Sequence, residues 1–416
     1  MHRLATRLRE SMSTLISSKR AAPVLFSLCT ILTIGGALFL KSSFTWSDEQ
    51  AYYVLAQNLF AHSIYSTNGQ VPTAFRPPGY AFFLSFWLHL GSSVRFLRSV
   101  NLCLWLLSVL LTYKATEMLI GHGSAVVSIV LLLAYPILFY TASFLYPQIL
   151  GADLFLTLLY LHLKYGERGA LTIVVQGLVF GLLILTLPIY LFAIPALQFL
   201  ISKKAGIVRA MFVTAVAIFI VSLWCARNYR RFHSIVFVAT QAGHELLVGN
   251  SEHTTPTAGV NADISQKVII ANQLKLNEIQ TDRFFAHAAI QWIAQHPTQW
   301  SILYMSKFLN WFNFRNDLKT KEQSSVFKWT LSFFTWYSLL TLALCRVCFD
   351  TRRLSADEIC LCVVYLTGAA AYAVFFTRLR YRVPFDYILI ILAAGFCGER
   401  LGYQQERMPK LLRIHA

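Results

Sequence analysis

The sequence predicts an all-α protein that crosses the membrane many times, and three observations support this prediction. Of the 416 residues, 56% are hydrophobic and 13% are charged, whereas a soluble protein carries about 25% charged residues. The mean hydropathy is +0.55. Apolar runs of about 20 residues, the length that crosses a membrane, recur along the chain. These features exclude a soluble enzyme, a disordered chain and a secreted disulfide scaffold.

Ten apolar runs are expected to form membrane-spanning helices. They cover 21–40, 97–117, 123–143, 147–163, 169–186, 188–202, 207–226, 328–347, 357–376 and 384–398. The run at 79–90 is short for a span and rich in aromatic residues, so we expect it to lie in the membrane interface. If it crossed the membrane, the chain would have eleven spans, and Lys164 and Arg168 would face outward unless 169–202 formed a single broken span.

The distribution of charge predicts which side each end faces. Lys and Arg outnumber Asp and Glu by 36 to 19, for a net charge of +17. In a membrane protein such an excess collects on cytoplasmic segments and indicates membrane lipids rather than nucleic acid as partners. Basic residues precede the first span, so we expect a cytoplasmic N-terminus and, after ten spans, a cytoplasmic tail. The compact chain without an ER-retrieval signal favours a bacterial inner membrane.

This topology divides the chain into five parts. They are a basic cytoplasmic N-terminus (1–20), an N-terminal transmembrane catalytic module (21–226) with the outer loop 41–96, an extracytoplasmic region (227–327), C-terminal transmembrane helices (328–398) with the outer turn 377–383, and a cytoplasmic tail (399–416). The residues suited to chemistry fall in the outer loop, the extracytoplasmic region and the outer turn. We therefore expect the site to face the periplasm or exterior.

The first outer loop contains an acidic pair, Asp48 and Glu49, at the start of a predicted helix. A Ser and a Gln three residues apart flank the pair in a capping-box pattern, and the helix dipole favours an ionised Asp48. The pair could serve only as favourable helix charges. However, Arg76, a Pro-Pro turn and Tyr80 follow it beside the lipid boundary. A carboxylate, a cation and aromatic residues at that depth could process a lipid-borne anion.

The stretch WSDEQAYYVLAQNLFAHSIYSTNGQVPTAFRPPGY resembles the first extracytoplasmic loop of the GT-C glycosyltransferases, in particular of the protein mannosyltransferases and the lipid A aminoarabinose transferases. The shared pattern is an acidic D-E pair, a Tyr, an A-x-N-L helix and R-x-P-G-Y. Three later stretches are also similar, in the same order: ARNYRRFHSIVFVATQAGHELLVGNS, AIQWIAQHPTQWSILYMSKFLNWF and RLRYRVPFDYILIILAAGF. The resemblance implies a GT-C-type bundle of about ten transmembrane helices, with interfacial helices in the first outer loop.

The resemblance also implies an inverting transfer of a hexose or pentose from a polyprenyl-phosphate donor to a hydroxyl acceptor on a glycan, lipid or protein. Asp48 then becomes the candidate general base that takes the acceptor proton. Glu49 is the lesser candidate, which could orient Asp48 or hold the sugar. An ordinary carboxylate suffices as the base because a phosphate monoester is already a good leaving group.

The leaving phosphate gains negative charge as its bond to the sugar breaks, and guanidinium groups suit its oxygens. Arg378, Arg380 and Arg382 alternate along the late outer turn, and in an extended turn they would share a face. Anchoring to lipid headgroups is the plainer interpretation of these arginines. Arg76 and Lys307 are further candidates for the donor phosphate, and Lys307 could equally be a lysine that snorkels to the interface.

Other residues are expected to line the substrate cavity, although a solvated loop or a helix end would also explain them. They are Tyr52, Tyr80, Arg227, Asn228, His244, Glu245 and Asn250, together with Tyr135-Pro136, Tyr146-Pro147 and Pro188-Ile-Tyr190 at the outer ends of spans. The acidic residues are too scattered for a metal cage, so we expect no cofactor. A divalent metal stays open as an alternative, because branches of the resembled group differ in using one.

Functions of other classes also fit parts of the sequence. A lipid-linked sugar flippase would need a polar path through its spans, and these spans hold very few charges. An O-antigen ligase or polymerase would place basic residues in a late outer loop, but it leaves the acidic pair at Asp48 unexplained. A structural scaffold would make the order of the similar stretches a coincidence.

Overall fold

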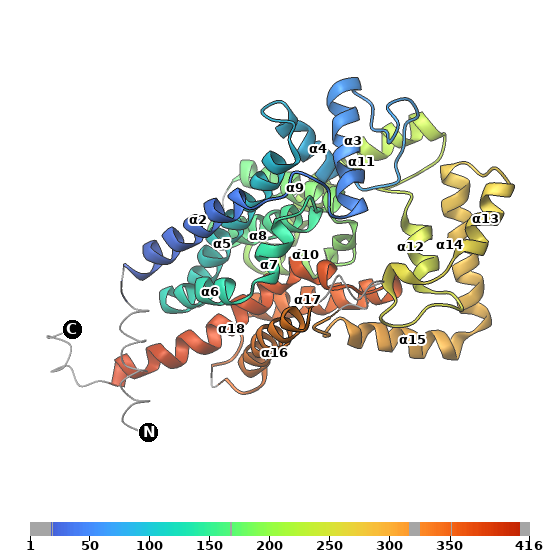
Figure 1. Cartoon of the computed structure of the whole chain (residues 1–416). Coiled ribbons are helices and arrows are strands. Elements are labelled where there is room, and N and C mark those ends of the chain that lie inside the picture. Colours follow the sequence, from blue (N-terminus) through green and yellow to red (C-terminus); the bar gives the residue numbers. More distant parts are fainter. Residues whose placement is uncertain (1–17, 19, 167–168, 316–324, 351, 408–416) are drawn as a thin grey trace.

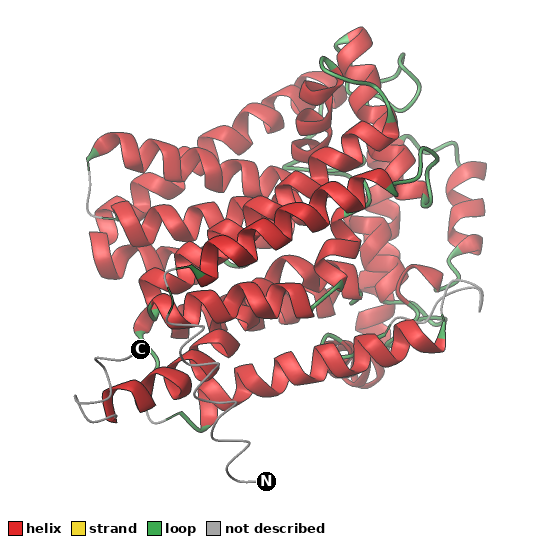
Figure 2. Cartoon of the chain, turned by 60° about the vertical axis from the view of Figure 1, so that its left-hand side comes forward, coloured by secondary structure: helices red, strands yellow, loops and turns green. Residues whose placement is uncertain are grey.

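The computed structural model describes residues 18, 20–166, 169–315, 325–350 and 352–407. Within these ranges the chain forms helices joined by loops and no β-strand (Figure 2). The predicted basic N-terminus up to residue 17 and the predicted tail beyond residue 407 lie outside the described residues. The all-α class expected from the composition is confirmed.

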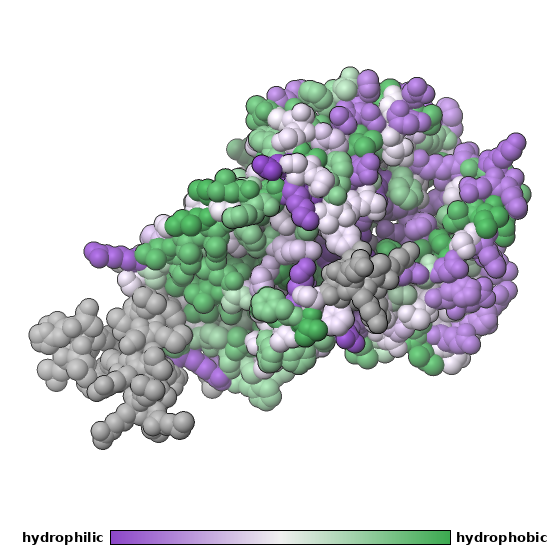
Figure 3. All heavy atoms as spheres, in the orientation of Figure 1, coloured by the Kyte–Doolittle hydropathy of each residue, from purple (hydrophilic) through white to green (hydrophobic). Residues whose placement is uncertain are grey.

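Six of the described helices are long and apolar enough to cross a membrane. They are α2 (Ala21–Leu38), α5 (Val94–Leu119), α11 (Ile207–Phe232), α16 (Val326–Cys348), α17 (Ala356–Val374) and the first 23 residues of α18 (Leu379–Arg407). The other helices of the bundle are α6 (His122–Ala134), α7 (Ile137–Ala142), α8 (Pro147–Tyr165), α9 (Ala170–Thr186) and α10 (Ile194–Ala205). Hydrophobic residues cover the flank of this bundle in Figure 3, which identifies the surface that faces lipid.

Helix α18 runs through the centre of the bundle and packs against α5, α6, α8, α16 and α17. Every residue from Tyr381 to Phe396 is buried. A helix buried over this length lies among the other helices of the bundle and not against lipid. This packing fixes the beginning of α18, including Arg380, inside the fold rather than on a free turn.

Helices α9 and α11 approach each other closely because α9 carries glycines at the contact. A Cβ atom added to Gly181 would lie 2.8 Å from Cβ of Ile220 and 3.1 Å from the carbonyl oxygen of Ala217. Small residues at such contacts let the backbones of membrane helices come together. The contact fixes α11, whose outer end carries Arg227 and Arg231.

The outer segments form further helices. They are α3 (Ser47–His62), α4 (Pro78–Leu88), α12 (Ala242–Gly249), α13 (Ser265–Gln273), α14 (Glu278–Gln295) and α15 (Pro297–Asn310). Figure 1 shows α12 to α15 at the end of the molecule opposite the start of α2 and the end of α18. Helix α4, with 11 residues, is about 16 Å long, too short to cross a bilayer. Its length therefore suits a position in the interface.

The structure differs from the predicted segments in some details. The third predicted span is interrupted at Pro136, because proline cannot donate the hydrogen bond that continues a helix, and it resumes as α7. The sixth opens with the 3-10 turn Pro188–Leu191 before α10. The expectation of an extended turn over 377–383 is wrong, because α18 already begins at Leu379.

Candidate active site

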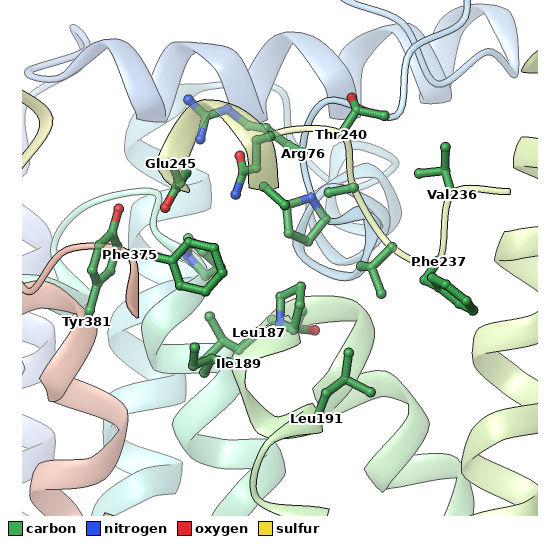
Figure 4. Close-up of a pocket in the computed structure, with 18 of the residues that line it drawn as sticks. Arg76, Leu187, Ile189, Leu191, Val236, Phe237, Thr240, Glu245, Phe375 and Tyr381 are labelled. Atoms are coloured by element: carbon green, nitrogen blue, oxygen red, sulfur yellow. The ribbon is translucent and has the colours of Figure 1, made fainter. Parts of the chain in front are cut away.

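A cavity of about 420 Å³ opens between the outer helices and the bundle. Its walls come from distant parts of the sequence. They are the starts of α3, α8, α14 and α18, the end of α17, the turn before α4, the connection from α9 to α10, and the segment that leads into α12. In Figure 4, Arg76, Glu245 and Tyr381 gather on one side, and apolar side chains from the α9–α10 connection line another. The cavity therefore has a polar end and an apolar wall.

Asp48 occupies the polar end and lies between two arginines. Its Oδ1 accepts a hydrogen bond from Arg76 at 2.5 Å, and its Oδ2 accepts one from Arg380 at 2.5 Å. These partners are 28 and 332 residues away in the sequence. Local structure positions these three side chains. Asp48 lies in the first turn of α3, Arg76 precedes the Pro77–Pro78 turn, and Arg380 lies in the first turn of α18.

The charge state of Asp48 follows from burial and from its two cationic partners. About a fifth of each side chain is exposed: 22% for Asp48, 20% for Arg76 and 21% for Arg380. Burial alone would raise the pKa of Asp48, but the guanidinium groups of Arg380 and Arg76 hold this pKa below its ordinary value. Asp48 is therefore ionised, and it is a weak base for as long as both arginines hold it.

Aromatic rings support the two arginines. The guanidinium carbon of Arg76 lies 5.2 Å from the ring centroid of Tyr52, and that of Arg380 lies 5.1 Å from the centroids of Tyr146 and Tyr381. A ring face attracts a cation through its quadrupole. All three tyrosines line the cavity. Tyr381 was not among the site residues predicted from the sequence. The signal that could have identified it is its position between Arg380 and Arg382.

Glu245 brings a second carboxyl group to the polar end (Figure 4). It projects from α12, which packs against α14. Burial raises the pKa of Glu245 to about 7, and the positive charges of Arg380 and Arg76 oppose this rise. Near neutral pH the group therefore populates both its protonated and its ionised form. It can donate a hydrogen bond in the first form and accept one in both.

The apolar wall extends from the cavity to the surface. It is formed by the segment from Thr186 to Phe192 and by the segment from Ile235 to Val238. Ile235 and Phe237 are 65% and 69% exposed. A ligand with an anionic head and a hydrocarbon tail fits this arrangement, because the head would reach the arginines and the tail could leave along apolar side chains.

Glu49 stabilises the fold, whereas the sequence had suggested it as a candidate catalytic residue. It is fully buried, and its carboxylate accepts hydrogen bonds from Arg98 at 2.8 Å and from the backbone N–H groups of Thr45 at 2.9 Å and Leu145 at 3.0 Å. It also closes the capping box of α3, a role that the sequence pattern had suggested for Ser47 and Gln50. Since the described cavity lining does not include it, Glu49 anchors the helix that presents Asp48.

Of the three arginines predicted to share a face, Arg380 reaches the cavity. Residues two apart in a helix point in directions about 200° apart, so Arg382 turns inward. There it pairs with Asp386 at 3.1 Å and donates to backbone carbonyls after α15 at 2.7 and 2.8 Å. Arg378 precedes the helix and packs against Gly259. The described cavity lining includes neither Arg378 nor Arg382.

Lys307 also differs from the expectation that it would contact the donor phosphate, because its side chain is buried away from the cavity. Its ammonium group donates hydrogen bonds to the carbonyl of Gly249 at 2.9 Å, to the carbonyl of Phe375 at 2.8 Å and to Oδ1 of Asn250 at 3.1 Å. Burial lowers the pKa of Lys307 to about 7. The side chain joins α12 and α15 to the backbone that leads to Arg380.

Some of the remaining residues that were predicted to line the cavity do so, and others do not. Tyr52 lines the cavity, whereas eight others are absent from its described lining: Tyr80, Tyr135, Pro136, Tyr190, Arg227, Asn228, His244 and Asn250. Hydrogen bonds within the fold engage Tyr80, Arg227, Asn228 and Asn250. Tyr80 exchanges hydrogen bonds with Asn101 at 2.8 and 3.1 Å, and Arg227 donates to the carbonyl of Thr73 at 2.9 Å. Asp282 and Arg283 line the cavity without having been predicted.

Among the residues that the structure describes, no group of three His, Cys, Asp or Glu side chains is placed to hold a metal ion. The two acids at the polar end, Asp48 and Glu245, face arginines instead.

The comparisons with known proteins give matches among solved structures. No protein-family model matches it, and no curated protein does. The apo oligosaccharyltransferase of Archaeoglobus fulgidus matches with a TM-score of 0.52 and 15% identity, over 95% of this chain and 52% of that chain. ArnT from Cupriavidus metallidurans bound to undecaprenyl phosphate matches with a TM-score of 0.48 and 12% identity, over 92% of this chain and 79% of that chain.

The match to the oligosaccharyltransferase concerns the fold. It extends over nearly the whole chain at low identity, and the chain spans about half the length of that enzyme. The helical bundle and the short helices of the first outer loop are those that the sequence resemblance implied. The protein therefore has a GT-C-type fold, which is a bundle of helices in the membrane.

Proposed function

We propose that the chain is a membrane glycosyltransferase that moves a sugar from a polyprenyl-phosphate donor to a hydroxyl acceptor on the outer face of a bacterial inner membrane. One observation carries the proposal: Asp48 meets Arg76 and Arg380 at the polar end of a cavity whose apolar wall continues to the surface. The GT-C fold and the resemblance of the outer loops agree with this function.

The two ends of the cavity suit the two parts of such a donor. Arg76 and Arg380 offer planar guanidinium groups, which bind phosphate oxygens through paired hydrogen bonds. The segment from Thr186 to Phe192 offers apolar surface to the first isoprene units, whose burial is favourable. The rest of the polyprenyl tail would enter the bilayer past Phe237, which is exposed.

The transfer needs a base for the acceptor and positive charge for the leaving group. The acceptor oxygen attacks the anomeric carbon while the bond from that carbon to the phosphate oxygen breaks, which inverts the configuration. Asp48 takes the proton of the acceptor hydroxyl. Arg76 and Arg380 balance the second negative charge that the phosphate acquires. The products are the glycosylated acceptor, polyprenyl phosphate and a protonated Asp48.

Donor binding also makes Asp48 a better base. Without a donor, Asp48 holds both arginines and its pKa is lowered by them. A phosphate competes for the same guanidinium groups. Once these groups turn to the phosphate, Asp48 loses part of the interaction that lowers its pKa. The base is therefore strengthened when the donor is in place, and Glu245 is left free to hydrogen bond to hydroxyl groups of the sugar.

The proposal is tested in a strain that lacks the gene, by mass spectrometry of envelope glycans and of polyprenyl-linked sugars. We expect one sugar to be missing from the envelope and its polyprenyl-phosphate form to accumulate. The wild-type gene and the control Glu252→Gln, an exposed carboxylate, should restore the sugar, and Asp48→Asn should not. Unchanged glycans and donor pools in the deletion strain would overturn the proposal.

A further inference from the structure

A second cavity, of about 650 Å³, lies next to the first outer loop. Its walls come from the end of α3, the loop that follows, α4, α9 and the outer half of α11. Segment 72–77 borders both cavities, because Pro72 lines the second while Arg76 and Pro77 line the first. The described residues that line the second cavity include no acid. Its only charged groups there are Arg227 and Arg231.

The other walls of this cavity are largely apolar and reach the lipid-facing surface. Ile64, Ile220 and Leu223 contribute aliphatic side chains, and Phe82 contributes an aromatic one. Leu223 and Phe82 are 55% and 47% exposed. Because α11 is long and apolar enough to cross the membrane, its exposed apolar side chains face hydrocarbon. The cavity thus opens sideways to the bilayer near the outer end of a spanning helix.

The two arginines are spaced to receive an anion. Arg227 and Arg231 are four residues apart on α11, so they lie on the same face, where like charges disfavour each other. Arg227 lies 4.7 Å from the ring centroid of Trp224 and donates to the carbonyls of Thr73 and Tyr65. Arg231 is exposed and forms no hydrogen bond or ion pair with any residue that the structure describes. No carboxylate in the described cavity lining offsets either positive charge. Outside the lining, the negative charge of Glu278 acts on Arg227.

We propose that this cavity binds an anionic phospholipid of the outer leaflet. The headgroup phosphate lies between Arg227 and Arg231, and an acyl chain lies along Ile220 and Leu223. Charge complementarity selects the headgroup, and the opening to hydrocarbon selects an occupant with a fatty chain over a free phosphate. The lipid lies outside the cavity of Asp48 and is not consumed in the transfer.

The bound lipid would also brace the wall shared with the first cavity. Arg227 already joins α11 to the carbonyls of Tyr65 and Thr73, and the hydroxyl of Tyr65 donates to the carbonyl of Arg76 at 3.0 Å. A headgroup held at Arg227 therefore stands beside the segment that presents Arg76 to Asp48.

Native mass spectrometry of the full chain in a neutral detergent tests the proposal, with phosphatidylglycerol and phosphatidylcholine as probes. We expect one phosphatidylglycerol to bind more tightly than phosphatidylcholine. Arg231→Ala should weaken its affinity about fivefold, and Leu223→Trp, which fills the cavity without changing charge, should weaken it as well. Arg230→Ala is the matched control, because Arg230 is exposed and adjacent but absent from the described lining. It should leave the affinity unchanged.

Two results would overturn the site. Equal losses for Arg231→Ala and Arg230→Ala would mean that the lipid responds to diffuse charge. Unchanged affinity in both Arg231→Ala and Leu223→Trp would place the lipid elsewhere. Elution at the monodisperse position of the wild type on size exclusion shows that each variant is folded, so a loss of binding can be assigned to the cavity.

Discussion

Replacing Asp48 by Asn separates its two proposed roles, because it should weaken catalysis and strengthen donor binding. Asn keeps the size of the side chain but cannot accept a proton at neutral pH. It also removes the negative charge that now holds Arg76 and Arg380, each 2.5 Å from a carboxylate oxygen. The two guanidinium groups are then available to a phosphate without competition.

The sizes of both effects can be estimated. A general base contributes about 10²- to 10⁴-fold to the rate, so transfer should fall by that factor. Two anions that share a guanidinium group are about 6 Å apart, which at an effective dielectric constant of about 20 gives a repulsion of about 2–3 kcal/mol. Relief of this repulsion should tighten binding of undecaprenyl phosphate about 30- to 150-fold.

Binding is measured by titrating undecaprenyl phosphate into detergent-solubilised protein, and transfer by complementation of the deletion strain. Glu252→Gln removes a charge of the same sign from an exposed position and should change neither quantity. Weaker binding of undecaprenyl phosphate to Asp48→Asn than to the wild type would refute the competition between Asp48 and the phosphate. Normal transfer by this variant would refute its role as the base.

Three further changes test the surroundings of Asp48. Arg380→Ala should raise the barrier by about 2.7–4 kcal/mol and weaken use of the donor more than of the acceptor; equal effects on the two KM values would contradict a phosphate role. Because ionisation of Glu245 above its pKa of about 7 adds negative charge beside the phosphate, the wild-type KM for the donor should rise between about pH 6 and pH 8. Glu245→Gln should remove this rise, and an identical pH profile would argue against it. Lys307→Met should lower the free energy of unfolding by about 1–3 kcal/mol or more, because the carbonyls of Gly249 and Phe375 lose their partner; an unchanged Tm would contradict this.

The membrane bundle could be predicted because hydropathy is a local property. Each apolar run that was expected to be a span contains helix in the structure. The helix that presents Asp48 was expected from a capping pattern, although Glu49 closes the capping box in place of Gln50. The resemblance of the outer loops then singled out both Asp48 and the arginines near residue 380. The structure places Asp48 and Arg380 in contact, although nothing local in either segment requires it.

The positions of individual charged side chains could not be predicted in the same way. Glu49 was kept as the lesser candidate base beside Asp48. Its partner Arg98 lies 49 residues away, so neither segment alone shows that the two side chains are buried together. Lys307 looked like a phosphate ligand, yet its oxygen partners lie 57 to 68 residues away. Among the late arginines, the choice depended on where α18 begins. A start at Leu379 turns Arg380 toward the cavity and Arg382 away from it.

A structure of the protein bound to undecaprenyl phosphate tests the central claim most directly. We predict that the phosphate contacts the guanidinium groups of Arg76 and Arg380, that at least one of them has left Asp48, and that the isoprene chain follows the segment from Thr186 to Phe192. A phosphate bound away from this cavity, with Asp48 still held by both arginines, would contradict the account.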